Sequence, residues 1–159
     1  MSRVLAAAVA GLLLALSLVM AIACAQGGAK ETVVIAAPKA ELKLEVARTE
    51  IQREYGLMNR TTIPPHTGMI FVFDADDRQY FWMKDTLVSL DMVFVGGDGT
   101  VRKVFADVPV LPKGISDAQI PLESADAQYV IELAAGEAAP DGLAEGVKLD
   151  LKSVPGASR

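Results

Sequence analysis

Short apolar segments with a period of two recur along this chain, and they constrain its fold more than any other feature. Residues 41–46 alternate charged and aliphatic side chains, and the large apolar side chains of residues 129–133 alternate again near the other end. Such alternation is typical of strands with one buried face. Residues 69–73 form a continuous apolar run, which favours a strand covered on both faces.

Two turns are expected to fold neighbouring strands back on each other. The acidic residues 74–77 follow the apolar run, so we expect residues 78–83 to return beside it. The glycine-rich residues 96–99 predict a hairpin between residues 87–95 and 100–105.

One helix is expected between the early strands. Thr49 and Gln52 have the spacing of a capping box, which predicts a helix from Glu50 to Asn59. Gly56 lies inside this segment, where glycine costs roughly 1 kcal/mol against alanine. We therefore expect the helix to pack closely on a sheet at Gly56.

The remaining segments complete a mainly β pattern. We expect an edge strand at residues 33–35, a long loop at residues 108–127 and a last strand at residues 147–151. Loops of that length are usually functional or mobile. About seven short strands with one main helix predict an α+β, mainly β fold, either a compact barrel or a sandwich-like domain.

The first residues have the composition of an export signal. Arg3 precedes the almost wholly apolar residues 4–23, which end in small side chains. A basic start, an apolar centre and a small-residue end predict a secretory signal peptide. An uncleaved membrane anchor is the alternative, because about 20 apolar residues can span a bilayer. We favour cleavage, since a polar linker begins at Gln26.

Cys24 is the only cysteine and lies at the end of this signal. Residues 21–24 resemble the lipobox of bacterial lipoproteins, in which the cysteine is lipidated and becomes the mature N-terminus. Alternatively, Cys24 leaves with the signal. In both cases the folded domain lacks a cysteine, which excludes an internal disulfide, a zinc–thiolate site and a cysteine nucleophile there. The expected segments are a signal peptide at 1–24, a linker at 25–37, one domain at 38–153 and a tail at 154–159.

The charge pattern argues against nucleic acid as a partner. The formal net charge is −5, and basic residues form no stripe and do not alternate with aromatic ones. Phosphate backbones bind mainly through such basic surfaces. Contact with a membrane is expected only through the signal peptide or a lipid anchor.

Several motifs, taken in order, resemble those of domain-of-unknown-function family 192. They are Gly56-Leu57-Met58-x-Arg60, Gly68-Met69-Ile70-Phe71-Val72-Phe73, Phe81-Trp82-Met83-Lys84-Asp85-Thr86, Leu90-Asp91, Asp98-Gly99 and Tyr129-Val130-Ile131-Glu132-Leu133-x-x-Gly136. The resemblance covers roughly residues 38–153. It implies a small, often exported, mainly β domain, and the family has no settled biochemical role to carry over.

The chain departs from the family pattern at several places. Asp85 stands where asparagine is usual, and Val88-Ser89 replace the usual isoleucine and proline. The long loop also lacks a cysteine–tyrosine pair that many members have. Asp85 adds a negative charge beside Lys84, which argues against a role that needs a neutral amide at this position. Because the loop lacks the cysteine–tyrosine pair, we also expect less chemistry from loop residues.

The third motif contains the candidate binding site. Charged side chains in an apolar strand are costly to bury unless they pair or bind something. If residues 80–86 are extended, Trp82, Lys84 and Thr86 share one face. Such a cluster could hold an anionic or sugar-like ligand. The candidate ligand-binding residues are Arg60, Trp82, Lys84, Asp85, Thr86 and Asp91.

Three interpretations of this cluster remain open. A partly buried ion pair between Lys84 and Asp91 would only fix the strand register. A ligand-binding module without catalysis would recognise a small molecule or a protein of the cell envelope. An enzyme would use Lys84 with Asp91 or Asp85 in acid–base chemistry, because a desolvated lysine beside a carboxylate can transfer protons.

No cofactor and no metal site is expected. Thioethers bind Cu(I), so four methionines allow a copper-handling hypothesis. Each lies in an apolar run, where methionine simply fills a core, and core packing is favoured. His66 is the only histidine and has no recognisable nucleophile beside it, so we expect a plain surface residue. The four methionines are Met58, Met69, Met83 and Met92.

Overall fold

The alternating and continuous apolar segments form a strand-rich domain. A computed structural model describes residues 30–156 of the protein. Contacts between residues divide the chain into two units, 1–30 and 31–159, and the elements below belong to the second unit. Its strands are β1 (Thr32–Ala36), β2 (Glu41–Ala47), β3 (Thr67–Phe81), β4 (Leu90–Val95), β5 (Val101–Val108) and β6 (Glu123–Ala134). Helix α2 (Glu50–Tyr55) and the short 3-10 helix η1 (Asp117–Gln119) complete the described elements. The expectation of a mainly β fold with one main helix is confirmed.

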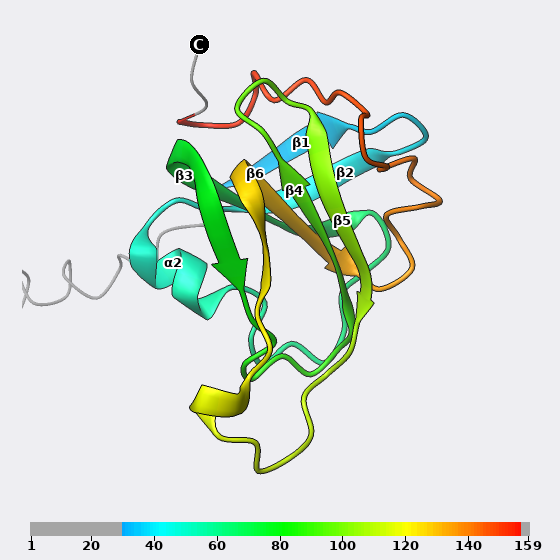
Figure 1. The fold of residues 1–159 in the computed structure, drawn as a ribbon. Helices are drawn as coiled ribbons and strands as arrows, with labels where there is room; N and C mark the ends of the chain where they lie inside the picture. Colours follow the sequence, from blue (N-terminus) through cyan, green and yellow to red (C-terminus); the bar gives the residue numbers. More distant parts are fainter. Residues whose placement is uncertain (1–29, 157–159) are drawn as a thin grey trace, which may run out of the picture. The chain divides into compact units, whose positions relative to one another are not determined.

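The strands form one mixed sheet in the order β1-β2-β3-β6-β4-β5 (Figure 1). Strands β2 and β3 are parallel and are connected through α2, whereas the other neighbours are antiparallel. No ladder joins β1 to β5 within residues 30–156, so the sheet does not close and the barrel alternative is wrong. The expected last strand is reduced to one isolated bridge between Thr100 and Lys148.

Strand β3 differs from the expected pair of short strands. Residues 78–81 do not return beside residues 69–73 but continue the same strand, and both halves pair with β6. The acidic segment between Val72 and Asp77 is a register shift rather than a turn. A β-bulge of this kind absorbs extra residues while the strand continues, and β6 is long enough to pair on both sides of it.

Several local expectations are confirmed. Residues 32–36 form the edge strand β1, so the sheet begins before Pro38. Strands β4 and β5 form the expected hairpin around residues 96–100. The signal peptide and Cys24 lie outside the described residues. Within residues 30–156, no helix is long and apolar enough to cross a membrane.

Helix α2 begins at the expected cap but ends early. The Gln52 N–H donates to the Thr49 hydroxyl at 3.2 Å, and the Thr49 N–H donates to the Gln52 side chain at 3.0 Å. The helix ends at Tyr55 because Gly56 has a φ of +48°. A Cβ at Gly56 would lie 3.3 Å from the Phe71 ring, which confirms close packing on the sheet.

The two faces of the sheet carry separate apolar cores. The first core contains Val93, Val95 and Ile131 and extends to the C-terminal segment 138–154. The second contains Phe71, Phe81, Phe94 and Leu57, and its aromatic rings meet edge to face. Because side chains of a strand alternate between faces, a polar residue within these strands is forced into one core or the other. The methionines Met69, Met83 and Met92 are buried in the second core, which fits core packing rather than a surface copper site.

Candidate functional site

A cleft of about 390 Å³ lies between α2 and the second core. Figure 1 shows α2 beside β3, which together supply much of its wall. Six aromatic side chains line the cleft, together with charged residues of the helix. The lining residues are Glu50, Arg53, Glu54, Tyr55, Gly56, Leu57, Met58, Phe71, Phe73, Tyr80, Phe81, Trp82, Lys84, Thr86 and Glu132.

Most of this lining comes from segments that carry the family motifs. Residues 56–58, 71–73, 81–86 and 132 belong to four different motifs and are far apart in the sequence. The fold brings them to one place because β3 and β6 are neighbours and α2 packs beside them. A concave site with aromatic walls and a few polar groups is the usual form of a small-molecule site.

Glu132 is the buried acid of the cleft. It lies in β6, in register with Met69 on one side and Met92 on the other, and only 5% of it is exposed. Among residues 30–156 no group donates a hydrogen bond to its carboxyl. Burial raises the pKa of Glu132 from 4.5 to about 8, and the charge of Arg60 only partly opposes this. A pKa of about 8 means that the neutral form predominates at pH 7.

Arg60 does not line the cleft, although its charge acts on Glu132. Its guanidinium makes two hydrogen bonds to Glu45, at 2.7 and 2.6 Å. This pairing raises the pKa of Arg60. Bidentate pairs of this kind are among the stronger ion pairs. Arg60 is thus occupied by Glu45 and acts on Glu132 only through its charge.

Trp82 and Lys84 form one wall of the cleft. The Lys84 ammonium lies 5.3 Å from the centre of the Trp82 ring and 2.5 Å from Asp117 in η1. The bond to Asp117 raises the pKa of Lys84. The Lys84–Asp91 ion pair, one of the three open interpretations, is therefore wrong, and a lysine with a raised pKa is a poor general base.

Thr86 and Asp85 lie next to this wall but not on the expected extended face. The strand ends at Phe81, and the chain turns so that the Thr86 N–H donates to the Met83 carbonyl at 3.2 Å. Asp85 has a φ of +51° and borders a second depression of about 270 Å³. That depression shares Glu54, Tyr55, Met58, Trp82 and Lys84 with the main cleft.

Asp91 is separate from the cleft. It is 1% exposed and accepts hydrogen bonds from the backbone N–H groups of Asp107, Gly136 and Ala138, at 2.8, 3.0 and 2.8 Å. The register between β4 and β5 shifts beside it, so its carboxyl fills a bulge. Asp91 therefore has a structural role. Acid–base catalysis by Lys84 together with Asp91 is wrong, because the two side chains have different partners and do not meet.

Glu132 is not among the site residues predicted above, although the sequence contains a signal for it. Residues 129–133 include one acid between apolar side chains, and the alternation of Tyr129, Ile131 and Leu133 drew attention to the opposite face. In a strand buried on both faces, that acid must lie in a core. The segment from Phe81 to Thr86 did locate the cleft, because Trp82, Lys84 and Thr86 all line it.

Comparison with protein-family models identifies the family of this chain. The model of DUF192, described as "Uncharacterized ACR", matches residues 32–151. A crystal structure of a candidate transcription regulator from Sinorhizobium meliloti is 31% identical, with a TM-score of 0.65 over 77% of this chain and 93% of that one. A protein of unknown function from Novosphingobium aromaticivorans is 28% identical, with a TM-score of 0.65 over 79% and 88%. No curated protein matches the chain. The chain belongs to domain-of-unknown-function family 192.

Proposed function

We propose that the cleft binds an uncharged, sugar-like ring molecule, and that the chain is a ligand-binding module without catalysis. The aromatic side chains of Tyr55, Tyr80 and Trp82 at the cleft support stacking of a ring. Both tyrosine side chains are exposed to solvent, so a ligand can contact their rings without displacing other protein groups. The volume of about 390 Å³ is in the range of small-molecule sites.

The charges around the cleft favour a neutral occupant. Arg53 donates to the Val72 carbonyl at 3.1 Å and lies 5.1 Å from the centre of the Phe73 ring. Lys84 is paired with Asp117, and α2 adds Glu50 at the rim. An anion would have to displace existing partners of both cations, which lowers its net gain.

Glu132 is the observation that carries the proposal. A buried carboxyl without a protein partner is costly, and a ligand atom can supply the missing hydrogen bond. Below its pKa of about 8 the carboxyl is neutral, so its O–H donates to an oxygen acceptor. A hydroxyl or ring oxygen of a sugar provides such an acceptor without bringing a charge into the cleft.

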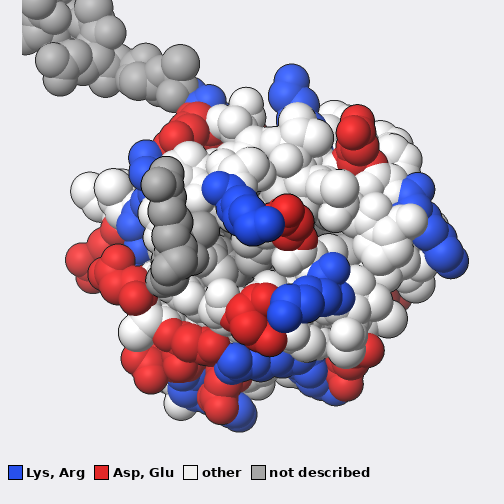
Figure 2. Space-filling view, turned by 90° about the horizontal axis from the view of Figure 1, so that it is seen from above, with Lys and Arg blue, Asp and Glu red and all other residues white. Residues whose placement is uncertain are grey.

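A nucleic-acid ligand has less support, although one structural neighbour is described as a candidate transcription regulator. Figure 2 shows a face on which basic and acidic side chains are intermixed. The formal net charge of −5 also disfavours a phosphate backbone. A small molecule fits the described surface better.

A second candidate function is an enzyme in which Glu132 donates a proton. Its raised pKa is the specific observation, since general acids work best with a pKa near the working pH. Lys84 and Asp91 have no role in this version, because each is held elsewhere. A Glu132→Gln variant separates the two functions: it would keep binding but abolish turnover in an enzyme.

The binding proposal is tested by calorimetric titration with glucose, N-acetylglucosamine and their disaccharides. Binding of at least one probe is expected, and Trp82→Ala should weaken it at least about tenfold through loss of stacking. Glu132→Leu removes the donor and should weaken binding similarly, whereas Glu132→Gln keeps a donor and should bind better than Glu132→Leu. The proposal fails if no probe binds, or if folded Trp82→Ala and Glu132→Leu both bind as the wild type does.

We also propose that the protein is exported and held at a membrane by Cys24. The support is the pattern of residues 3–25, with a basic start, an apolar centre and a lipobox-like end. Labelled palmitate should enter the protein in a bacterial host and should not enter a Cys24→Ala variant. A secreted product that begins after Cys24 would contradict the lipid anchor but keep export.

A further inference from the structure

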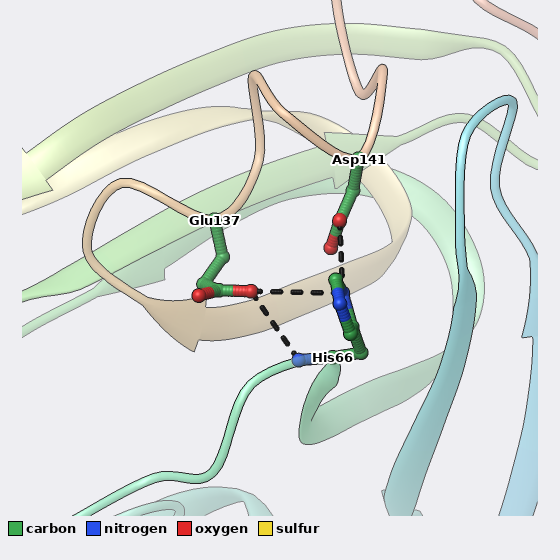
Figure 3. Close-up of side chains that lie close together, drawn as sticks. All are labelled: His66, Glu137 and Asp141. Atoms are coloured by element: carbon green, nitrogen blue, oxygen red, sulfur yellow. Dashed lines mark hydrogen bonds and ion pairs between the residues drawn. The ribbon is translucent and has the colours of Figure 1, made fainter.

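A second polar cluster lies away from the cleft, where the start of β3 meets the loop after β6. His66 Nδ1 lies 2.9 Å from Asp141 Oδ1 and 3.7 Å from Glu137 Oε2. The backbone N–H of His66 also donates to Glu137 Oε2 at 3.3 Å. Figure 3 shows the two acidic side chains approaching the same edge of the imidazole. His66 is therefore more than the plain surface residue that its sequence context predicted.

The Asp141 carboxyl has an unsatisfied oxygen. The side chain is 2% exposed, and within residues 30–156 its Oδ2 atom is buried without any hydrogen-bond partner. Buried polar atoms in native proteins nearly always have a partner, and an orphan points to a missing ion or water. The oxygen belongs to the same carboxyl that contacts His66, so the missing group would lie at this cluster.

Backbone hydrogen bonds fix the loop that carries Glu137 and Asp141. Gly136 and Ala138, on either side of Glu137, both donate to the buried Asp91 carboxyl. The Asp141 carbonyl accepts a hydrogen bond from the Lys39 N–H at 3.1 Å. The loop is thus fixed to the sheet and to the β1–β2 turn. Pre-organised ligands of this kind bind a metal ion with less loss of conformational freedom.

The distances fit one metal ion. One ligand atom from each of His66, Glu137 and Asp141 lies within 4.8 Å of the others. Ligands bind Zn²⁺ at roughly 2.0–2.2 Å, so two donors on one ion lie at most about 4.4 Å apart. The contacts to His66 already meet that limit, and Glu137 is partly exposed and has room to adjust.

We propose that His66, Glu137 and Asp141 bind a divalent first-row transition metal, with Zn²⁺ as the best fit. One imidazole nitrogen and two carboxylate oxygens form a mixed donor set that suits Zn²⁺ better than Mg²⁺ or Ca²⁺, which prefer oxygen alone. The ion would lie against His66 Nδ1 and Asp141 Oδ1, which are 2.9 Å apart. His66 is 53% exposed, so water or a second ligand can complete the coordination. The site is independent of the aromatic cleft.

The test uses the full chain without a polyhistidine tag and with Cys24→Ser, because a free thiol could bind Zn²⁺ by itself. The protein is freed of metal with a chelator and titrated with Zn²⁺, Mg²⁺ and Ca²⁺ by calorimetry. Histidine NMR shifts are followed in the same samples. His66→Gln is the main variant, because an exposed side chain can be changed without unfolding the protein. Asp141→Asn is the second variant, and Glu145→Gln is a control acid paired with Lys103 instead.

One Zn²⁺ per chain is expected, with a shift of the His66 imidazole signals on binding. His66→Gln and Asp141→Asn should each weaken binding at least about tenfold, and Glu145→Gln should bind as the parent does. The proposal is overturned if Zn²⁺ does not bind, or if His66→Gln leaves affinity unchanged. Equal binding of Mg²⁺ or Ca²⁺ would also overturn it, since the imidazole would then contribute nothing.

Discussion

Two buried carboxyl groups lie one register step apart on neighbouring strands and have opposite surroundings. Asp91 of β4 pairs with Leu133, and Glu132 of β6 pairs with Met92. Because side chains alternate along a strand, the two acids point to opposite faces of the sheet. Asp91 accepts three backbone N–H groups, whereas Glu132 accepts none among residues 30–156.

The difference shows that burial alone does not identify a functional acid. Asp91 has a complete set of partners supplied by a β-bulge and a loop, so its place is explained by the fold. Glu132 lies among aromatic side chains at a cleft, and its hydrogen-bonding capacity is left for a ligand. Glu132 combines burial with a place in the cleft wall, and this makes it the better candidate for function.

Replacing the two acids by their amides should separate them most clearly. Asp91→Asn places an amide donor against backbone donors and should lower the free energy of unfolding by about 3 kcal/mol or more. Glu132→Gln should change it by less than about 1 kcal/mol at pH 6, because one neutral polar group replaces another. Urea unfolding of both variants measures this. Similar losses in the two variants would contradict the comparison.

The stability of the wild type should fall as the pH rises from 4.5 to about 8. The pKa of Glu132 is raised by folding, so the folded state holds a proton that the unfolded state releases between pH 4.5 and about 8. The free energy of unfolding should then drop by about 1.4 kcal/mol per pH unit within that window, or about 2 kcal/mol from pH 6 to 7.5. The unfavourable contribution is absent below the window and complete above it.

The control for this pH dependence is Glu132→Gln, which keeps every other titrating group. The difference in unfolding free energy between wild type and variant should follow the predicted slope. A constant difference across the window would mean that the carboxyl of Glu132 titrates normally.

The cleft that contains Glu132 is also lined by Gly56, which packs against Phe71. Gly56→Ala places a Cβ against Phe71 at a φ of +48° and should destabilise the protein by about 1–2 kcal/mol. Gly146→Ala is the control, because Gly146 has a φ of +88° but no atom within 4 Å of an added Cβ. Thermal unfolding should show a greater loss for Gly56→Ala. Equal losses of stability in the two variants would show that contact with Phe71 contributes nothing to the effect.

The smallest stability effect is expected at Lys84. Its ion pair with Asp117 is exposed, and such pairs contribute little to stability. Lys84→Met should leave the melting temperature nearly unchanged but increase hydrogen exchange in the loop that carries Asp117. Lys103→Met is a matched control, since Lys103 also lies over an aromatic ring, Phe105, and pairs with an acid. Equal hydrogen exchange of the Asp117 loop in both variants would show that the Lys84–Asp117 pair does not hold this loop at the cleft.

Much of the fold was predictable because it rests on local signals. The alternation in residues 41–46 gave β2, the capping box gave the start of α2, and the glycine-rich turn gave the β4–β5 hairpin. The path of β3 was not predictable in this way. An acidic segment has the composition of a turn, and only the long partner strand β6 decides that it becomes a bulge.

The sequence predicts where the site lies, but it does not predict which side chains pair with one another there. Trp82, Lys84 and Thr86 line the cleft, because their motif lies at the end of a buried strand. The partner of Lys84 comes from η1, far along the chain, and no local pattern indicates it. The same holds for His66, whose acidic neighbours follow β6. Long-range pairs of this kind depend on topology, which spacing in the sequence does not encode.

The central claim is that Glu132 offers a neutral carboxyl to the cleft, and its own titration tests this most directly. Carbon-13 NMR of the glutamate side chains, assigned with Glu132→Gln, gives the midpoint in the folded protein. We expect a midpoint near the pKa of about 8 that burial produces. A midpoint near the ordinary value of about 4.5 would contradict it, because the acid would then be charged and solvated rather than held neutral for a ligand.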